Sequence, residues 1–361
     1  MNFTTKGISI LLTALVLNVC SFAAPRFWVG KGINDNWNNP ANWSATSGGA
    51  GGASVPDPTD NCFFDGAGAG AYNFSCTLDT NVTVNTLRAM PGFAQGIINQ
   101  GVFSVTINGG DFKWEDGSFS GGAGFFKIGP SQTNITIING IVNIGPGGFS
   151  ATGNGPFDLN GGTFSLSAGT FYTDKLYTQA GGIFNGGSAE VKFRDKNFNL
   201  DGGTFNSTSA NLFFSSNAVN IRNVPGWNHN NCTVYFDSTN TTSLSFGIGP
   251  NTSCDFYKVI VDKNSLSSAN DNLKFLDADT MNVLTDMHII TGEILYSQAA
   301  VKINGNLTAE TGFINSNVAF LFTGSINQTI ELKGTAYDKM DGLFFVRKPT
   351  TNYLTFLSPV K

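Results

Sequence analysis

Short runs of alternating apolar and polar residues recur along the chain, and turns that contain glycine separate them. Alternation with a period of two is typical of strands that bury one side and expose the other. We therefore expect strands in the following runs: residues 102–107, 134–138, 189–193 and 211–214. The intervening turns carry residues that tolerate a positive φ, in Asn-Gly or Asp-Gly pairs that begin at Asn108, Asn139, Asn160 and Asp201.

One six-residue phrase, LNGGTF in its first copy, returns along the chain in copies that start 20 and 21 residues apart. That spacing is the length of one coil of a β-solenoid and is too short for a repeat of two helices. The chain is therefore predicted to be all-β, a parallel β-helix in which Phe164, Phe184 and Phe205 stack inside successive coils. Burial of each ring would contribute roughly 1.5 to 3 kcal/mol.

The pattern divides the chain after residue 24 into three parts. Residues 25–76 are rich in Trp, Asn, Pro and Gly, and we interpret them as an N-terminal cap that covers the apolar end and free strand edges of the first coil. Regular coils are expected over 77–246, and a less regular β-helix over 247–361. The chain stops in a strand-like run with no closing cap, so we expect a truncated C-terminal end. Strand-like runs in the third part are 256–262, 281–284, 301–308 and 327–332.

Composition agrees with this class. The chain has 44 Gly, 32 Phe and only 12% charged residues, which is typical of an all-β repeat protein. A net charge of -5 supplies neither a basic surface for nucleic acid nor a cationic face for a membrane, so neither partner is expected.

Residues 1–24 are predicted to be a secretory signal peptide. Lys6 precedes an apolar stretch over 8–19, and small residues end at Ala24. The apolar stretch is shorter than the roughly 20 residues that span a bilayer, so cleavage is favoured over anchoring. We expect a secreted or cell-surface protein with no membrane span after signal removal. Cys20 leaves a lipoprotein as the alternative.

Four cysteines remain after the signal: Cys62, Cys76, Cys232 and Cys254. Three pairings are available, and the sequence-local one, Cys62 with Cys76 and Cys232 with Cys254, closes the shortest loops. Export makes these disulfides plausible. The alternative is four buried thiols that act as small apolar side chains. A zinc site is disfavoured because no CxxC accompanies them and the two histidines, His229 and His288, are far apart in sequence.

The N-terminal part resembles the opening of large secreted surface proteins of gliding Bacteroidota. The resemblance rests on an ordered set of phrases: WVGKG at 28–32, WNNPANWS at 37–44, the glycines of 48–52 and VPDPTDNCFFD at 55–65. In that group a W-x-G-x-G and N-W opening precedes a Gly-rich link, a V-P-x-x-x-D-N phrase and parallel β-helix coils. An insertion at 33–36 departs from the pattern and shifts its register.

The C-terminal part resembles the same group in its phrases DFYKVIV at 255–261, VKINGNLT at 301–308 and FTGSINQTI at 322–330. The resemblance implies export through the Sec system and then a type IX secretion system, which reads a C-terminal sorting domain. We expect that domain to belong to the part missing from a truncated C-terminal end. The resemblance supplies no catalytic residues, because the group is defined by its architecture.

The strongest enzymatic alternative is a polysaccharide lyase or hydrolase, which would need convergent carboxylates and a basic partner. The candidate cluster is Glu190, Lys192, Arg194 and Asp195, of which the first three fall on one side of a strand. The same spacing fits a solvated strand with cross-strand charge pairs. A calcium site is a further candidate, at the carboxylates Asp277, Asp279 and Asp286. They lack the glycine-punctuated ligand spacing of a calcium-binding loop, so solvated turn carboxylates are favoured. No metal or other cofactor is expected.

Three tryptophans in the first part, Trp28, Trp37 and Trp43, have two candidate roles. Their flat rings suit stacking against sugars, and they equally suit the closure of a solenoid end, which their position favours. Exposed Phe or Tyr ladders on the outside of the coils are a second candidate surface for glycans or partner proteins. The sequence thus predicts a non-catalytic, adhesin-like β-helical surface protein that contacts glycans or cell-surface proteins through an extended face.

Overall fold

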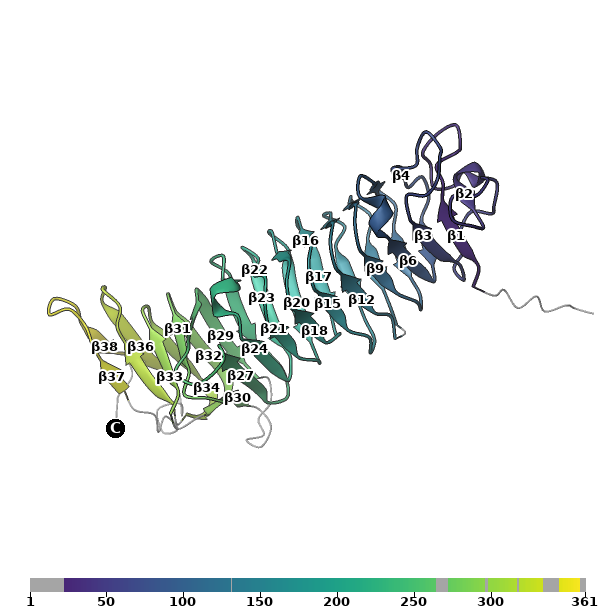
Figure 1. Ribbon diagram of the computed structural model, residues 1–361. Helices are drawn as coiled ribbons and strands as arrows, with labels where there is room; N and C mark the ends of the chain where they lie inside the picture. Colours follow the sequence, from purple (N-terminus) through teal and green to yellow (C-terminus); the bar gives the residue numbers. More distant parts are fainter. Residues whose placement is uncertain are drawn as a thin grey trace, which may run out of the picture.

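The computed structural model shows a parallel β-solenoid of about 12 turns, which confirms the predicted fold class. It describes residues 23–130, 132–263, 272–295, 298–316, 318–333 and 344–357, with the side chains of 311–316 left out of the description. The predicted signal peptide lies outside the described residues except for its last two. The coils stack into an elongated body with the N-terminal segment at one end (Figure 1). Among the described residues, no helix has the length and apolarity needed to cross a bilayer.

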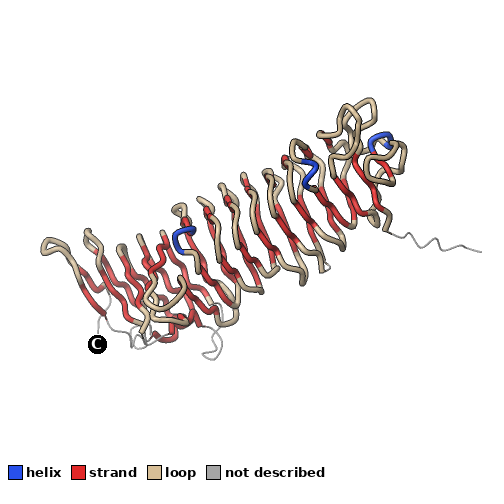
Figure 2. Tube along the Cα trace, viewed as in Figure 1, coloured by secondary structure: helices blue, strands red, loops and turns tan. Residues whose placement is uncertain are grey.

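Each regular coil contributes one short strand to each of three faces, which we number in the order in which the chain reaches them from β4 onward. Among the described residues, three short 3-10 helices lie in the connections between strands (Figure 2). The 3-10 helices are η1 (Pro40–Asn42), η2 (Pro91–Phe93) and η3 (Val224–Gly226). The first face contains β4 (Ser75–Thr77), β7 (Ile97–Asn99), β10 (Ser118–Ser120), β13 (Ile141–Ile144), β16 (Thr163–Leu166), β19 (Ile183–Asn185), β22 (Thr204–Asn206), β25 (Trp227–Asn228), β28 (Ser253–Phe256), β31 (Thr280–Val283), β33 (Ala300–Ile303), β35 (Ala319–Phe322) and β37 (Phe344–Val346).

The second face contains β5 (Val82–Val84), β8 (Val105–Ile107), β11 (Phe126–Ile128), β14 (Phe149–Ala151), β17 (Thr170–Thr173), β20 (Glu190–Arg194), β23 (Asn211–Ser215), β26 (Thr233–Phe236), β29 (Lys258–Asp262), β32 (Met287–Leu295), β34 (Leu307–Ser316), β36 (Gln328–Leu332) and β38 (Leu354–Phe356). The third face contains β1 (Pro25–Trp28), β3 (Asn61–Phe64), β6 (Thr86–Ala89), β9 (Phe112–Trp114), β12 (Ile135–Ile137), β15 (Phe157–Leu159), β18 (Tyr177–Gln179), β21 (Phe198–Leu200), β24 (Ala218–Ile221), β27 (Thr242–Phe246) and β30 (Asn272–Phe275).

The solenoid changes its pairing between β25 and β32. On the first face, β4 to β25 form one sheet and β28 to β37 form another. The long strand β32 pairs with β29 through its first residues and with β30 through its last, so it joins the second and third faces. Trp227 links the two sheets of the first face, because its Nε1 donates a hydrogen bond to the carbonyl of Asp255 at 2.9 Å.

The predicted phenylalanine column exists. Phe164 pairs in register with Phe184, and Phe184 with Phe205. The rings stack with centroids 5.9 Å and 4.6 Å apart, and all three side chains are fully buried. Trp227 continues the column at 5.4 Å from Phe205. This column fixes the register of the first face, because a slip by one residue would turn the aromatic rings outward.

The turns of the repeat depend on glycine. At the three turns that begin with Asn139, Asn160 and Asp201, the positive φ falls on a glycine and not on the Asn or Asp. At Gly182 (φ 64°) a Cβ atom would lie only 2.6 Å from the backbone of Gly161 on the preceding coil. The paired glycines therefore allow both a left-handed backbone and close contact between coils.

The N-terminal segment packs three indoles against the end of the coils. β1 pairs in parallel with β3 and antiparallel with the two-residue strand β2 (Trp43–Ser44). The rings of Trp28 and Trp37 lie edge-on against Trp43, with centroids 5.2 Å and 4.7 Å away. Phe64 of β3 completes this aromatic cluster, with its centroid 5.7 Å from that of Trp43.

Candidate functional site

The four residues of the predicted charged cluster lie on and directly after β20, but they do not form one site. Glu190, Lys192 and Arg194 all point outward, as the alternation predicted. Lys192 Nζ forms an ion pair with Glu190 Oε1 at 2.5 Å, and this pair is partly exposed to solvent. Glu190 and Lys192 therefore neutralise each other along one strand. Arg194 and Asp195 instead lie beside a groove.

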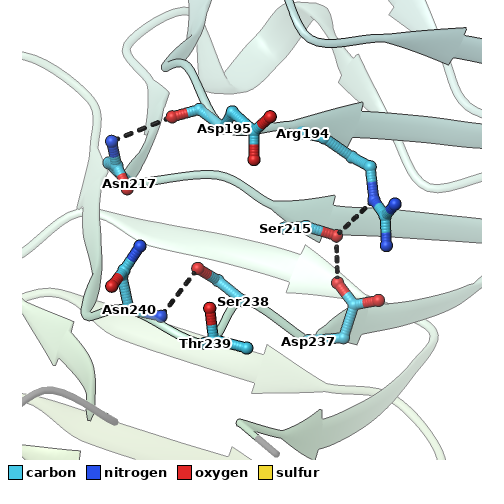
Figure 3. Close-up of a pocket in the computed structure, with 8 residues that line it drawn as sticks. All are labelled: Arg194, Asp195, Ser215, Asn217, Asp237, Ser238, Thr239 and Asn240. Atoms are coloured by element: carbon cyan, nitrogen blue, oxygen red, sulfur yellow. Dashed lines mark hydrogen bonds between the residues drawn. The ribbon is translucent and has the colours of Figure 1, made fainter.

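The groove has a volume of about 300 Å³ and lies where the second face turns into the third (Figure 3). Residues from three successive coils line it: Arg194, Asp195, Ser215, Asn217, Asp237, Ser238, Thr239 and Asn240. Every one of these side chains is polar or charged. We call this hollow the Arg194 groove.

Hydrogen bonds across the coils hold several of these groups in place. Ser215 Oγ donates to Asp237 Oδ1 at 2.5 Å, and Arg194 Nε lies 3.5 Å from Ser215 Oγ. Asn217 Nδ2 donates to the backbone carbonyl of Asp195 at 2.9 Å. Figure 3 shows these contacts running from one coil to the next. Because neighbouring coils are bonded in register, the groove is built on a rigid scaffold.

The backbone places Asp195 at the lip of the groove. Its φ of 62° lies in the left-handed region, which aspartate tolerates better than most residues with a side chain. Asp195 makes the turn from β20 to β21, and its amide donates to the carbonyl of Ser215 on the next coil at 3.1 Å. The exposed carboxylate therefore stands at a fixed position beside Arg194.

An outward aromatic column runs along the second face beside the groove. Tyr172, Lys192, Phe213 and Tyr235 occupy the same outward position on four successive coils. Phe213 and Tyr235 stack at 4.6 Å, and the Lys192 ammonium lies 5.0 Å from the centre of the Phe213 ring. The Arg194 guanidinium lies 6.0 Å from the centre of the Tyr172 ring. All four column side chains are partly exposed.

Sequence reasoning did not identify these three aromatics individually. The signal was present, because each one sits at an outward position directly beside a buried residue of its strand, in the runs TFYT, NLFFS and TVYF. The sequence alone does not show that the three aromatic side chains form one column, because this depends on the register between the strands.

The arrangement suits a ligand rich in hydroxyl groups. The Arg194 groove offers hydrogen-bond donors and acceptors, and it contains a cationic group, two carboxylates and neutral hydroxyls and amides. The adjacent aromatic column offers apolar ring edges. Sugars present the same combination of hydroxyls and apolar CH surface. Asp195 and Asp237 are the two carboxylates of the groove, whereas Glu190 is not among its lining residues.

Two of the three carboxylates considered for calcium, Asp279 and Asp286, hold backbone amides of the solenoid. Asp279 is buried and accepts hydrogen bonds from the amides of Phe246 and Thr252 at 2.9 Å and 3.0 Å. Asp286 Oδ1 accepts from the amide of Asn306 at 2.7 Å. Within the described ranges, no three His, Cys, Asp or Glu side chains gather where they could hold a metal ion.

The three tryptophans are not open to a sugar. Trp28 and Trp43 have no exposed surface, and Trp37 retains 2%. Trp43 Nε1 donates to the carbonyl of Trp37 at 2.8 Å, so its polar atom is also satisfied inside the segment. Stacking of sugars on these rings would require the N-terminal segment to open.

The four cysteines of the described chain are free thiols, so of the two alternatives left open by the sequence the structure shows the one with no disulfide among them. Each cysteine is buried and belongs to the hydrophobic core, and Cys232 Sγ also accepts a hydrogen bond from Ser207 Oγ at 3.3 Å. Cys76, for example, pairs with Ile98 at the start of the column that leads to Phe164. The structure therefore matches the alternative of small buried side chains.

We expect these thiols to react only after unfolding. Burial raises the pKa of Cys62, Cys76 and Cys254 well above the ordinary value, and raises that of Cys232 to about 11. Since the thiolate is the reactive form, iodoacetamide should modify native protein of residues 25–361 very slowly. Mass spectrometry in denaturant without reductant should then show an adduct on each of the four thiols. No adducts under those conditions would mean that both disulfides exist.

Comparison with known proteins adds no relative. No family model, no curated protein and no solved structure matches this chain. Its kinship with Bacteroidota surface proteins thus stays a prediction, and a function has to be argued from the geometry described above.

Proposed function

We propose that this chain is an exported, non-catalytic β-helical surface protein that contacts glycans through the Arg194 groove and the aromatic column beside it. The supporting observation is the juxtaposition of an entirely polar groove with partly exposed Tyr172, Phe213 and Tyr235 on one face of a rigid solenoid. Each contact would be weak, and a long face that repeats such contacts gains strength through multivalency.

Arg194 and Asp195 are the groups best placed to bind sugar hydroxyls. Arg194 is exposed, and the only hydrogen bond that its guanidinium makes with the described residues is the long contact to Ser215 Oγ. Asp195 is exposed and its carboxylate makes no hydrogen bond or ion pair with the described residues. Hydrogen bonds to charged groups contribute about 1.5 to 3 kcal/mol each.

The aromatic column would contribute apolar contact, but not broad platforms. The ring of Phe213 is covered by Tyr235 on one coil and by the Lys192 ammonium on another. Its outward edge is what a ligand would meet. A sugar in the groove would therefore touch the edges of these rings while its hydroxyls bind the polar lining.

We expect Arg194→Ala to weaken glycan binding about tenfold, since the loss of one charge-assisted hydrogen bond corresponds to at least 1.4 kcal/mol. Asp195→Asn should act similarly, because it removes the charge and keeps a residue that tolerates positive φ. A glycan array would identify ligands, and titration calorimetry would measure their affinity. Arg222→Ala is the matched control, since Arg222 is an exposed arginine that pairs with Asp201 away from the groove.

The polysaccharide lyase or hydrolase alternative is tested with the same variants. Release of unsaturated products or new reducing ends from polysaccharides, abolished by Arg194→Ala or Glu190→Ala, would replace the binding proposal with an enzymatic one. Equal binding by wild type, Arg194→Ala and Asp195→Asn would show that the groove is not the glycan site.

A further inference from the structure

The Arg194 groove continues toward the N-terminal end of the solenoid. A second hollow of about 160 Å³ is lined by Gly153, Asn154, Asp174, Asp195 and Lys196. Asp195 lines both hollows, so they meet at the turn after β20. We call the joined hollows the corner trough.

The corner trough follows one corner of the solenoid over five successive coils. This corner is made by the turns that lead from the second face to the third: residues 152–156, 174–176, 195–197, 216–217 and 237–241. The three middle turns are two or three residues long, and the outer two are five residues long. The two longer turns supply Asn154 at one end and Thr239 and Asn240 at the other. Short turns thus make up the middle of the corner trough, and the longer turns lie at its two ends.

These dimensions set the length of a ligand. Five coils are separated by four intervals, and strands that pair lie about 4.8 Å apart, so the trough is about 19 Å long. We propose that the corner trough binds one extended oligosaccharide of neutral sugars, aligned with the solenoid axis and bounded by the turns 152–156 and 237–241. This inference rests on the proposed glycan-binding function.

The charges of the trough favour neutral sugars over polyanions. Arg194 and Lys196 are its cations, and Asp174, Asp195 and Asp237 are its anions. An acidic chain would meet three carboxylates along this path, whereas hydroxyl groups bind carboxylates, amides and cations alike.

Several groups in the trough are already engaged, and others are free for a ligand. Asp174 Oδ1 accepts from the amide of Gly153 at 2.8 Å, and Asp237 accepts from Ser215. Lys196 is exposed, and its ammonium forms no hydrogen bond or ion pair with the described part of the chain. Lys196 is therefore the natural contact for the part of the ligand that lies beyond Asp195.

Calorimetry with a neutral oligosaccharide series of increasing length tests this inference. The affinity should rise with length until the ligand reaches about 19 Å and then level off. Lys196→Ala should weaken the longest ligands about tenfold and leave the shortest unchanged, whereas Arg194→Ala should weaken both. Lys127→Ala, on the outward surface of β11, is the control for loss of an exposed lysine.

The outcomes distinguish a failure of the corner trough as an oligosaccharide site from a failure of the proposed glycan binding itself. Glycan binding that is sensitive to Arg194→Ala but independent of ligand length and of Lys196 would overturn the corner trough and leave the proposed function standing. Affinity that keeps rising in ligands well beyond about 19 Å long would also overturn the proposed limits of the trough at the turns 152–156 and 237–241. A protein that binds no glycan at all would remove both proposals.

Discussion

Replacing Phe184 by alanine is expected to lower the free energy of unfolding by about 3 to 5 kcal/mol. Phe184 has no exposed surface and lies between Phe164 and Phe205 in the inner column of the first face. The substitution would leave a cavity between stacked rings, and coils that hydrogen-bond on both sides cannot collapse easily to fill it. Urea denaturation followed by circular dichroism would measure the loss.

The adjacent residue provides a matched control. Ile183 points outward from the same strand and is 39% exposed. The neighbouring coils carry Thr163 and Thr204 at this position, so Ile183→Thr copies a residue that the outer surface already holds. Its effect should stay within about 0.5 kcal/mol. Equal losses from the two variants would contradict the assignment of inner and outer sides.

The length of the coils and the side chains that face the core were predictable, because a short sequence phrase encodes both and recurs along the chain. The phrase that contains Phe164, Phe184 and Phe205 encodes both the coil length and the side that each ring faces. Alternation in the run 189–193 likewise placed Glu190 and Lys192 on the outer side of β20. Such features need only the period of the strand and the length of the repeat.

The groove was not predictable in the same way, because it depends on the register between coils. Arg194, Asn217 and Asp237 are separated in sequence by unequal intervals, and only the pairing of β20, β23 and β26 brings them together. The pattern of charges grouped Arg194 with Glu190 and Lys192. In the structure Glu190 and Lys192 form an ion pair, whereas Arg194 lines the groove.

The state of the cysteines also depends on how the coils are arranged in space, which the spacing along the chain does not show. Sequence separation made Cys62 with Cys76 the shortest loop, but neighbours along the chain belong to different faces of a coil. The structure places each thiol in a separate buried position within the hydrophobic core.

Replacing Trp43 by alanine is expected to cost about 3 to 5 kcal/mol of stability at the N-terminal end. Its buried ring contacts Trp28, Trp37 and Phe64, and its Nε1 makes a hydrogen bond that the variant would lose. In a solenoid each coil interacts mainly with its neighbours, so the damage should be greatest near the substitution. Hydrogen exchange should accelerate in β1 to β6 and change little around β20.

The same variant separates a packing role from a sugar-binding role for the tryptophans. Ile33→Ala, in the same segment but at a side chain that is 92% exposed, should leave stability nearly unchanged. Glycan affinity at the distant Arg194 groove should be equal in wild type, Ile33→Ala and Trp43→Ala. A loss of glycan binding by Trp43→Ala without faster exchange in β1 to β6 would instead show that the indole meets the ligand. The segment would then have to open in solution, because the closed packing leaves that ring no exposed surface.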